Sequence, residues 1–575
     1  MATWETRPLA MVDALWDGCA ESTCGAVEAA VASGVDTGSI PVLTHGAYSR
    51  GGVGPRTLVR WVGMVQDMGN PEMFLSVVGG QCTLYRDWVA GEPEPGEYVD
   101  GDDGKRLLGQ RLLIYGVATP GETEWARVRV SGQNQQSLRH APRDTTPEEA
   151  AASRSFLAIK RLRDDDEEEL KTNEEETERS RARNEEETDA REMPKLRAKR
   201  DDEAVDCVIR FYGAETPLLN QIVEVVGVVG SDEAIAPPVE GQPRDEFDNA
   251  LWDPPLSMVA RIHALCWRRL DDWFPLAAPL APPDSQGDER WEAMRSRALA
   301  YLTQAFYGDA ATAEYILLAL LAKPIGRSND RERCVGSFTL DLVVPDARRV
   351  PVSKRLASTL APLFPRCALV RASNARVPTR ENERLTTSDI QLVDGTCVVL
   401  DFNLKAVPVH LELLIADPKV VLYDYGLGHE ARLPFDAPLL VVTQNRRGTG
   451  ADCPVAPFFQ QQQQQQQSDD DAPLPDPDLV DDDLRAYLAA ARHHSVDIDD
   501  DLAQTLQDHF VNSRQRGEIP GNEADQRLTI WISLCRLDAK SRGLPVASAA
   551  NWAHCAKLER IRLIRYDSLK RRAGL

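Results

Sequence analysis

Residues 385–402 read LTTSDIQLVDGTCVVLDF, and this stretch decides the interpretation of the fold. Its apolar run, 398–400, follows an Asp-Gly pair at 394–395 and ends in an acid, Asp401, which predicts a buried strand. The residue at the carboxyl end of such a strand faces the crevice where open α/β sheets bind ligands. In nucleotide-hydrolysing sheets that position holds the magnesium-coordinating acid, but here Phe402 follows where a catalytic Glu is expected.

A phosphate-binding loop would have to follow the strand predicted at residues 338–344. Such a loop needs glycines, whose backbone N–H groups surround phosphate, and a Lys that reaches the outer phosphates. Residues 345–354 read PDARRVPVSK, with no glycine and two prolines that lack N–H donors. We therefore interpret Asp401 as a helix cap or a strand-end residue, and predict no catalytic, cofactor-binding or metal site and no enzymatic activity.

The composition excludes several classes of protein. The chain has 575 residues and a formal net charge of −24, which argues against a general nucleic-acid coat protein. Its 11 cysteines include no C-x-x-C pair, so neither a zinc site nor a disulfide framework is predicted. No apolar run reaches the ~18 residues of a membrane span, and the start, MATWETRPLA, lacks the regions of a signal peptide. We expect an intracellular, reducing compartment.

The first half of the chain predicts a β domain interrupted by a charged segment. Strands are predicted at 58–68, 73–78, 112–117 and 125–130, and again at 207–212 and 222–229. Two strands cannot form a stable sheet alone, so we predict that the last two pair with those before the interruption in one small β-barrel or sandwich.

The interruption contains almost nothing apolar, as in DDDEEE at 164–169, and is predicted to be a disordered or charged-helix linker. Deleting residues 164–192 is expected to leave thermal stability nearly unchanged. Its basic end, 195–200, suits either a nuclear import signal or a solvated linker end.

Alternating helices and strands in the second half predict an α/β sheet. Helices are predicted at 258–270, 291–306, 311–321 and 352–363, and strands at 338–344, 368–371, 398–401 and 439–443. Four further helices are predicted at 484–492, 502–514, 524–542 and 547–572.

Other candidate sites have ordinary explanations. His493, His494 and His509 lie on predicted helices and are expected to face solvent. Residues 497–501 resemble the opening of a calcium loop, but Leu502 occupies the position that needs Gly, so a helix start is predicted. The basic helix 557–572 suits nucleic acid, an acidic partner or a solvated face.

Several stretches together resemble the mini-chromosome maintenance complex-binding protein family. They are VGMVQDMGNPEMF at 62–74, PGETEW at 120–125, VARIHALCWRRL at 259–270, GDAATAEYILLALL at 308–321, VGSFTLDL at 335–342, TCVVLDF at 396–402 and ADC at 451–453. The resemblance runs from about residue 41 to residue 569, apart from the linker and the glutamine run.

The second half also resembles a decayed replicative helicase subunit. Residues 338–356 stand where such a subunit has its strand, phosphate loop and helix, and Asn445 stands where it has a polar sensor. Gln526 stands where its lid has a sensor Arg, and a finger motif is missing after residue 439. The resemblance implies that the fold is kept and the chemistry lost.

The predicted fold class is α/β plus β: an AAA+-like α/β core without a P-loop and with a helical C-terminal lid, preceded by a split OB-like β-barrel. The predicted parts are an N-terminal helical segment at 1–45, OB-like β domain at 46–132, acidic linker at 133–203, completing strands at 204–235, degenerate AAA+-like core at 250–455, polyglutamine and acidic loop at 456–476, and helical lid-like domain at 477–575.

The family resemblance implies a non-enzymatic nuclear partner of replicative helicase subunits. It implies roles in assembling, protecting or unloading helicase complexes during DNA replication, and in sister-chromatid cohesion during the cell cycle. It leaves chromatin as a candidate partner and implies neither a membrane nor a small-molecule substrate. The alternative is a single-stranded nucleic-acid-binding adaptor that uses the OB-like domain.

Overall fold

The fold is described from a computed structural model of the chain. The described residues are 3–4, 6–17, 20–75, 77–78, 81–82, 84–86, 108–132, 200, 202–213, 215–230, 259–276, 289–327, 334–381, 384–444, 449–459, 474–519 and 524–573. They fall into two compact units, within residues 1–119, 127–270 and 382–384 for the first and 120–126, 271–381 and 385–575 for the second. Residues 133–199 of the predicted linker (133–203), the glutamine run (460–467) and Asn445 lie outside the described residues.

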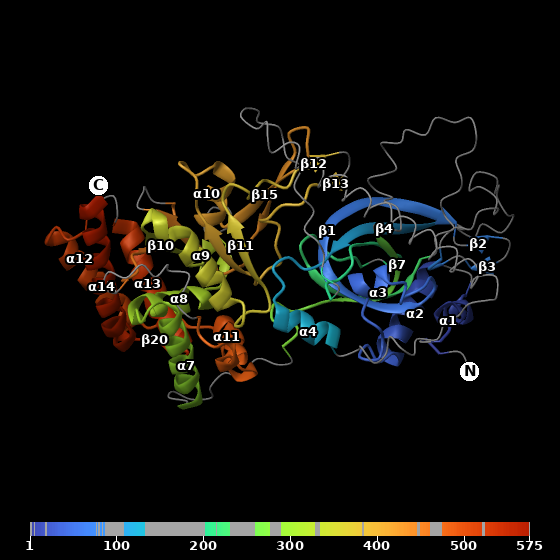
Figure 1. The fold of residues 1–575 in the computed structure, drawn as a ribbon, viewed down its shortest axis with the longest axis horizontal. Coiled ribbons are helices and arrows are strands. Elements are labelled where there is room, and N and C mark those ends of the chain that lie inside the picture. Colours follow the sequence, from blue (N-terminus) through green and yellow to red (C-terminus); the bar gives the residue numbers. More distant parts are fainter. Residues whose placement is uncertain are drawn as a thin grey trace, which may run out of the picture. The chain divides into compact units, whose positions relative to one another are not determined.

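The first unit is built on a closed barrel with the strand order β1-β4-β5-β7-β6 (Figure 1). Its strands are β1 (Leu58–Leu75), β4 (Leu108–Val117), β5 (Cys207–Phe211), β6 (Ile222–Val229) and β7 (Ala260–Arg269). Neighbours pair antiparallel except β5 and β7, which are parallel. Pairing of β1 with β6 and of β4 with β5 confirms that the strands on both sides of the interruption form one sheet.

Two secondary-structure predictions in this region were wrong. Residues 258–270, predicted as a helix, contain strand β7, in which Ala260, Ile262 and Ala264 pack into the barrel core. Core residues at every second position are typical of a strand. The high apolar content of this stretch hid the alternation in the sequence. Residues 125–130, predicted as a strand, lie in helix α4 (Glu124–Gly132), where Ala126 and Val130, four positions apart, are both buried.

Strand β1 is longer than the sequence indicated. A turn was predicted at Asn70-Pro71, but β1 continues through these residues and is 18 residues long in total. Its register against β4 shifts between Val65 and Asp67 and again between Met68 and Pro71. Such irregularities bend a strand without ending it, so Pro71 is accommodated at a bulge rather than at a turn.

Two glycines allow a tryptophan to fill the barrel. Trp61 is fully buried, and its indole N–H donates to the carbonyl of Val205 at 2.9 Å. A Cβ atom at Gly63 or at Gly116 would overlap the Trp61 ring, so the ring passes over these two backbones only because they lack side chains. Helices α1 (Pro8–Leu15) and α2 (Ala20–Gly34) pack on a second apolar cluster of this unit.

The second unit contains a five-stranded sheet with the order β11-β14-β17-β10-β18. These strands are β10 (Leu340–Val344), β11 (Cys367–Arg371), β14 (Cys397–Asp401), β17 (Leu439–Gln444) and β18 (Cys453–Val455). All neighbouring pairs are parallel. The predicted strands at 338–344, 368–371, 398–401 and 439–443 are confirmed, whereas β18 was not predicted. Every residue of β10 and β14 is buried, as in sheets covered on both faces.

Helices account for most of the remainder of this unit. They are α7 (Glu289–Ala305), α8 (Ala310–Leu321), α9 (Asp346–Leu360), α10 (Val409–Ile415), α11 (Asp482–His493), α12 (Asp500–Gln515), α13 (Ala524–Ser541) and α14 (Ala549–Ala573). The four predicted C-terminal helices are confirmed, and residues 497–501 are indeed a helix start, since α12 begins at Asp500. Within the described residues, no helix has the length and apolar character needed to cross a membrane.

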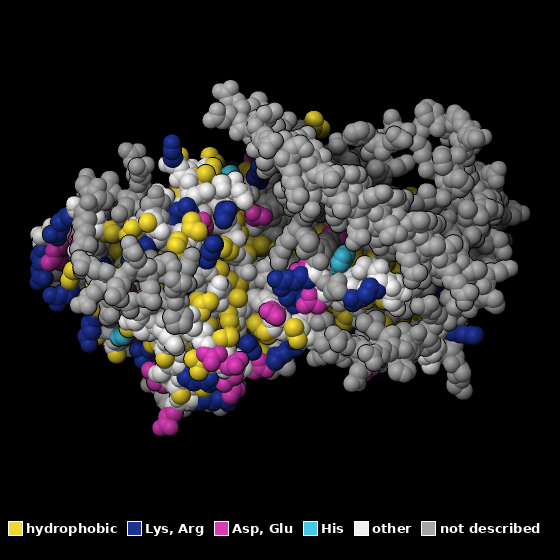
Figure 2. Space-filling view, in the orientation of Figure 1, with side chains coloured by type: hydrophobic (Ala, Val, Ile, Leu, Met, Phe, Trp, Pro, Cys, Tyr) yellow, Lys and Arg dark blue, Asp and Glu magenta, His cyan; other side chains and the backbone are white. Residues whose placement is uncertain are grey.

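The short elements complete the fold. They are α3 (His45–Ser49), β2 (Val77–Val78), β3 (Gln81–Cys82), β8 (Gly326–Arg327), β9 (Cys334–Val335), β12 (Arg380–Glu381), β13 (Arg384–Leu385), β15 (Val420–Asp424), β16 (Glu430–Pro434), a 3₁₀ turn (Pro477–Leu479), β19 (Asp497–Ile498) and β20 (Val546–Ala547). On the face drawn in Figure 2, acidic and basic side chains are interspersed near α7 and α11, where Arg297 contacts Asp481 at 2.8 Å.

Candidate functional site at the carboxyl edge of the sheet

Three neighbouring strands of the second unit bring their carboxyl ends to one edge. Because β17 lies between β10 and β14 and all three are parallel, Val344, Asp401 and Gln444 end their strands on the same side. Open α/β sheets bind ligands at this edge. A nucleotide or magnesium site of this sheet would therefore lie at this edge.

Asp401 is the last residue of β14, so it is a strand-end residue as predicted. Its carboxylate is almost fully buried and forms an ion pair with the guanidinium of Arg349, which lies in the first turn of α9. Since a buried charge is tolerated only with a partner, the two residues depend on each other. The Asp401 carboxylate is thus balanced by a cation from the chain itself.

The connection between β10 and α9 leaves no room for a phosphate loop. Strand β10 ends at Val344 and α9 begins at Asp346, so Pro345 alone connects them. A phosphate cradle requires a run of N–H groups in a glycine-rich loop between strand and helix, and Pro345 contributes none. Lys354 lies exposed on α9, away from any such loop.

Gln526, which the helicase resemblance aligns with a sensor Arg, is hydrogen-bonded to the backbone next to the sheet. Gln526 of α13 donates from Nε2 to the carbonyl oxygens of Ala451 and Asp452, at 3.4 and 3.2 Å. Ala451 and Asp452 precede β18, which is parallel to β10, so Gln526 joins α13 to the amino end of the sheet and not to the edge where Asp401 lies. The prediction that the histidines lie on helices and face solvent is confirmed for His493, which contacts Lys323, and for His509, which lies beside two tryptophan rings. It was wrong for His494, which follows the end of α11, is half-buried and contacts the Leu544 carbonyl.

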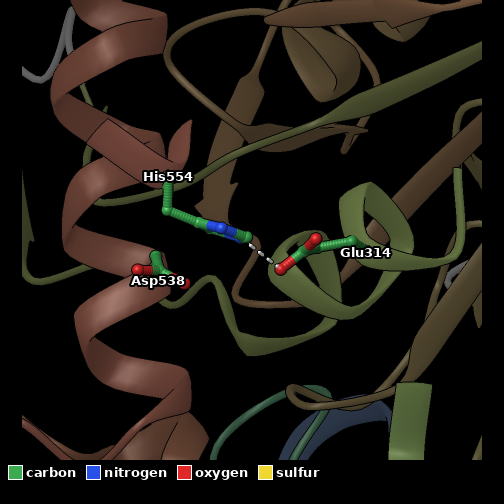
Figure 3. Close-up of side chains that lie close together, drawn as sticks. All are labelled: Glu314, Asp538 and His554. Atoms are coloured by element: carbon green, nitrogen blue, oxygen red, sulfur yellow. Dashed lines mark hydrogen bonds and ion pairs between the residues drawn. The ribbon is translucent and has the colours of Figure 1, made fainter. Parts of the chain in front are cut away.

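A second group of titratable side chains lies on three helices of the same unit (Figure 3). Glu314 of α8, Asp538 of α13 and His554 of α14 present ligand-type atoms within 4.8 Å of one another. The imidazole Nε2 of His554 lies 2.8 Å from Glu314 Oε1. By donor chemistry alone, two carboxylates and an imidazole suit a divalent metal.

Arg295 of α7 makes this group unsuitable for a metal. Its Nη2 is hydrogen-bonded to Glu314 and lies 3.3 Å from Asp538 Oδ1, so a guanidinium already bridges the two carboxylates. Asp538 also accepts from Arg542 Nε at 3.1 Å and from Asn551 Nδ2 at 2.8 Å. A metal ion would have to displace these donors. We interpret the group as a buried ion network that joins α7, α8, α13 and α14.

Sequence reasoning missed this network. The only signal was Glu314, a lone acid within the apolar helix ATAEYILLALL. A buried acid requires a partner, which predicts that a cation exists but not that it is Arg295, 19 residues away.

His554 makes the stability of the network dependent on pH. The hydrogen bond that the His554 imidazole donates to the Glu314 carboxylate raises the pKa of His554, and this outweighs the lowering of the pKa by burial. Burial raises the pKa of Glu314, but the His554 bond and the Arg295 charge outweigh it and lower the pKa. Because the folded pKa of His554 is raised, its contribution is complete below ~6.5 and is lost as pH rises through the folded pKa.

We expect His554→Gln to lower the free energy of unfolding by about 0.5–1 kcal/mol at pH 6 and by less at pH 8, since the side chain is about a third exposed and partly screened. Urea unfolding at the two pH values measures the difference. His429→Gln, at an exposed position, is the matched control. Equal losses at both pH values would show that His554 contributes by packing and not by charge.

The barrel of the first unit bears on the nucleic-acid alternative. Arg111 of β4 donates to Glu72 at 2.8 Å and lies over the rings of Phe74 and Tyr212, with Arg210 of β5 3.7 Å from the same Glu72. These cationic and aromatic groups contact one another. Nothing in the described part of the barrel singles out nucleic acid as a ligand.

Comparison with known proteins gives consistent matches along both units. A family-level sequence profile described as "Mini-chromosome maintenance replisome factor" matches residues 28–566. A "Mini-chromosome maintenance complex-binding protein" of Arabidopsis thaliana is 23% identical over 564 residues, which cover 91% of this chain and 90% of the relative. Relatives with the same name in Danio rerio and Homo sapiens are each 23% identical, over 602 and 599 residues, which cover 90% of this chain and 89% of each relative.

Proposed function

Because the chain belongs to the mini-chromosome maintenance replisome factor family, we propose that it binds subunits of the mini-chromosome maintenance complex and catalyses no reaction of its own. The family match over residues 28–566 carries this proposal, since it extends through both compact units. It also confirms the family resemblance found in the sequence. The relatives' names state that they bind this complex, and the proposal extends that property to this chain.

We further propose that the second unit is a degenerate AAA+-like core with α11–α14 as its lid, and that the barrel is OB-like. Two features support the first part of this proposal: β10, β17 and β14 are adjacent parallel strands, and Asp401 ends β14. The single-residue connection at Pro345 and the Asp401–Arg349 pair support the loss of nucleotide chemistry.

A core of this kind could bind helicase subunits without hydrolysing ATP. A subunit-like surface can occupy the interface that a helicase subunit offers to its neighbour, while contributing no ATP chemistry, so it binds without completing a productive ring. On this basis we propose action in the nucleus and on chromatin, in the assembly, protection or unloading of helicase complexes, with a role in sister-chromatid cohesion.

Purification of the full chain from cells tests the proposal. We expect helicase subunits to co-purify in less than a complete ring. Nuclease treatment before purification is the matched control and should not reduce their recovery, because the contact is between proteins. Recovery of nucleic acid alone, or loss of the subunits after nuclease treatment, would instead favour the single-stranded nucleic-acid adaptor.

A further inference from the structure

The second unit contains a cavity of about 340 Å³ between the sheet and the helices α13 and α14. Its lining includes Asp341 of β10, Thr449, Gln526, Ile530, Leu563 and Asp567. None of these residues was singled out by the sequence except Gln526. The cavity is distinct from the site at the carboxyl ends of the strands, because its lining does not include Val344, Asp401 or Gln444.

Asp341 is an acid in the middle of a buried strand. Its neighbours Leu340 and Leu342 belong to the apolar core, so Asp341 points from the opposite face of the sheet. One carboxylate oxygen accepts from Thr443 Oγ1 at 2.7 Å and the other from Thr449 Oγ1 at 3.1 Å. Among the described residues, no Lys, Arg or His forms an ion pair with it.

This environment is unfavourable for an ionised carboxylate. Burial raises the pKa of Asp341 to about 6, although the two hydroxyl hydrogen bonds oppose the shift. Each carboxylate oxygen has a second lone pair, so Asp341 can accept further hydrogen bonds from a group inside the cavity. An entering cation would supply the counter-ion that the chain does not provide.

Two guanidinium groups also line the cavity, but both are committed to an internal carboxylate. Arg562 donates to Glu559 from Nε at 2.7 Å and from Nη2 at 2.6 Å, and from Nη1 to the Pro454 carbonyl at 2.9 Å. Arg527 lies 3.7 Å from the same Glu559. Glu559, which is not part of the lining, offsets the charge of these two guanidinium groups, and the lining adds the carboxylates of Asp341 and the exposed Asp567, so the site favours a cation over an anion.

We infer that this cavity binds a primary ammonium or guanidinium group on an apolar stem, with Asp341 as its counter-ion. Ile530 and Leu563 provide apolar contact for the stem, and Asp567 adds a second acceptor where the lining is exposed. A lysine or arginine side chain of another protein has this chemistry, and so does a free polyamine. The inference does not depend on the proposed helicase contact, because it concerns the cavity alone.

Thermal unfolding of the full chain with small probes tests the inference. N-acetyl-lysine amide, and separately spermidine, are added at saturating concentration, with N-acetyl-glutamine amide as the neutral probe and sodium chloride matching the ionic strength. We expect a cationic probe to raise Tm by about 3 °C, and the neutral probe and the salt to leave it unchanged. A response to the lysine probe identifies a side chain as the source, and a response to spermidine alone identifies a free polyamine.

Variants locate the response in the cavity. Asp341→Asn keeps the shape and is expected to abolish the shift, and Leu563→Trp, which places a larger apolar side chain in the lining and leaves the Asp341 carboxylate unchanged, should abolish it independently. Asp508→Asn, at an exposed position of α12, should respond as the original chain does. An equal shift with the neutral probe, or a full response in either cavity variant, would overturn the inference.

Discussion

Replacing Arg295 with methionine is expected to lower the free energy of unfolding by about 3–5 kcal/mol. Arg295 is 4% exposed, and its guanidinium bridges Glu314 and Asp538 while Nε donates to Ser541 Oγ at 2.9 Å. Methionine fills similar apolar volume but carries no charge. Its side chain would leave two buried carboxylates facing each other with fewer donors, which is more costly than losing a surface ion pair.

Arg297→Met on the same helix is the matched control. Arg297 pairs with Asp481 at 2.8 Å, but its side chain is 40% exposed, so the expected loss is below about 1 kcal/mol. Urea unfolding of both variants measures the difference. Adding Glu314→Gln to Arg295→Met should recover part of the stability, because one uncompensated charge is removed. Equal losses for Arg295→Met and Arg297→Met would show that the network is not held by buried charge.

The parts of the fold that sequence reasoning predicted are those whose pattern is local. Strands β6, β14 and β17 are buried on both faces and therefore appear as continuous apolar runs, which cannot be confused with polar loops. Three of the four C-terminal helices, α11, α12 and α13, have acids in the first turn, and all four show helical spacing over 12 to 25 residues. Pairing across the interruption followed from a simple requirement, that two strands cannot form a stable sheet alone.

The errors occur where partners distant in sequence decide the outcome. Strand β7 was mistaken for a helix because its apolar residues also satisfy helical spacing, and only the barrel selects the strand. Strand β1 passes Pro71 because β4 accommodates a bulge there. Nothing local to Asp401 indicates Arg349, which precedes it by 52 residues, so the sequence showed that a magnesium site was incomplete but not what neutralises the acid.

Titration of the full chain with magnesium-ATP is expected to give no saturable heat below about 1 mM, and hydrolysis is expected to be unmeasurable. In nucleotide-hydrolysing α/β sheets, phosphate is bound by backbone N–H groups that converge from a glycine-rich loop, together with a lysine and a bound magnesium ion. Here Pro345 alone joins β10 to α9. The α9 N-terminus still offers its dipole, which by itself is a weak anion site. Asp401 is followed by Phe402, so no carboxylate is placed there to polarise water.

Two variants separate a structural role of Asp401 from a nucleotide-binding one. Asp401→Ala should lower the free energy of unfolding by about 3 kcal/mol, because it leaves the Arg349 guanidinium without its buried partner, and should not change the ATP titration. Combining it with Arg349→Met should restore part of the stability, since both charges are then absent. Tight magnesium-dependent ATP binding that Asp401→Ala abolishes would contradict this assignment and favour an active ATPase. Loss of stability without any nucleotide effect is the outcome that the buried Asp401–Arg349 ion pair predicts.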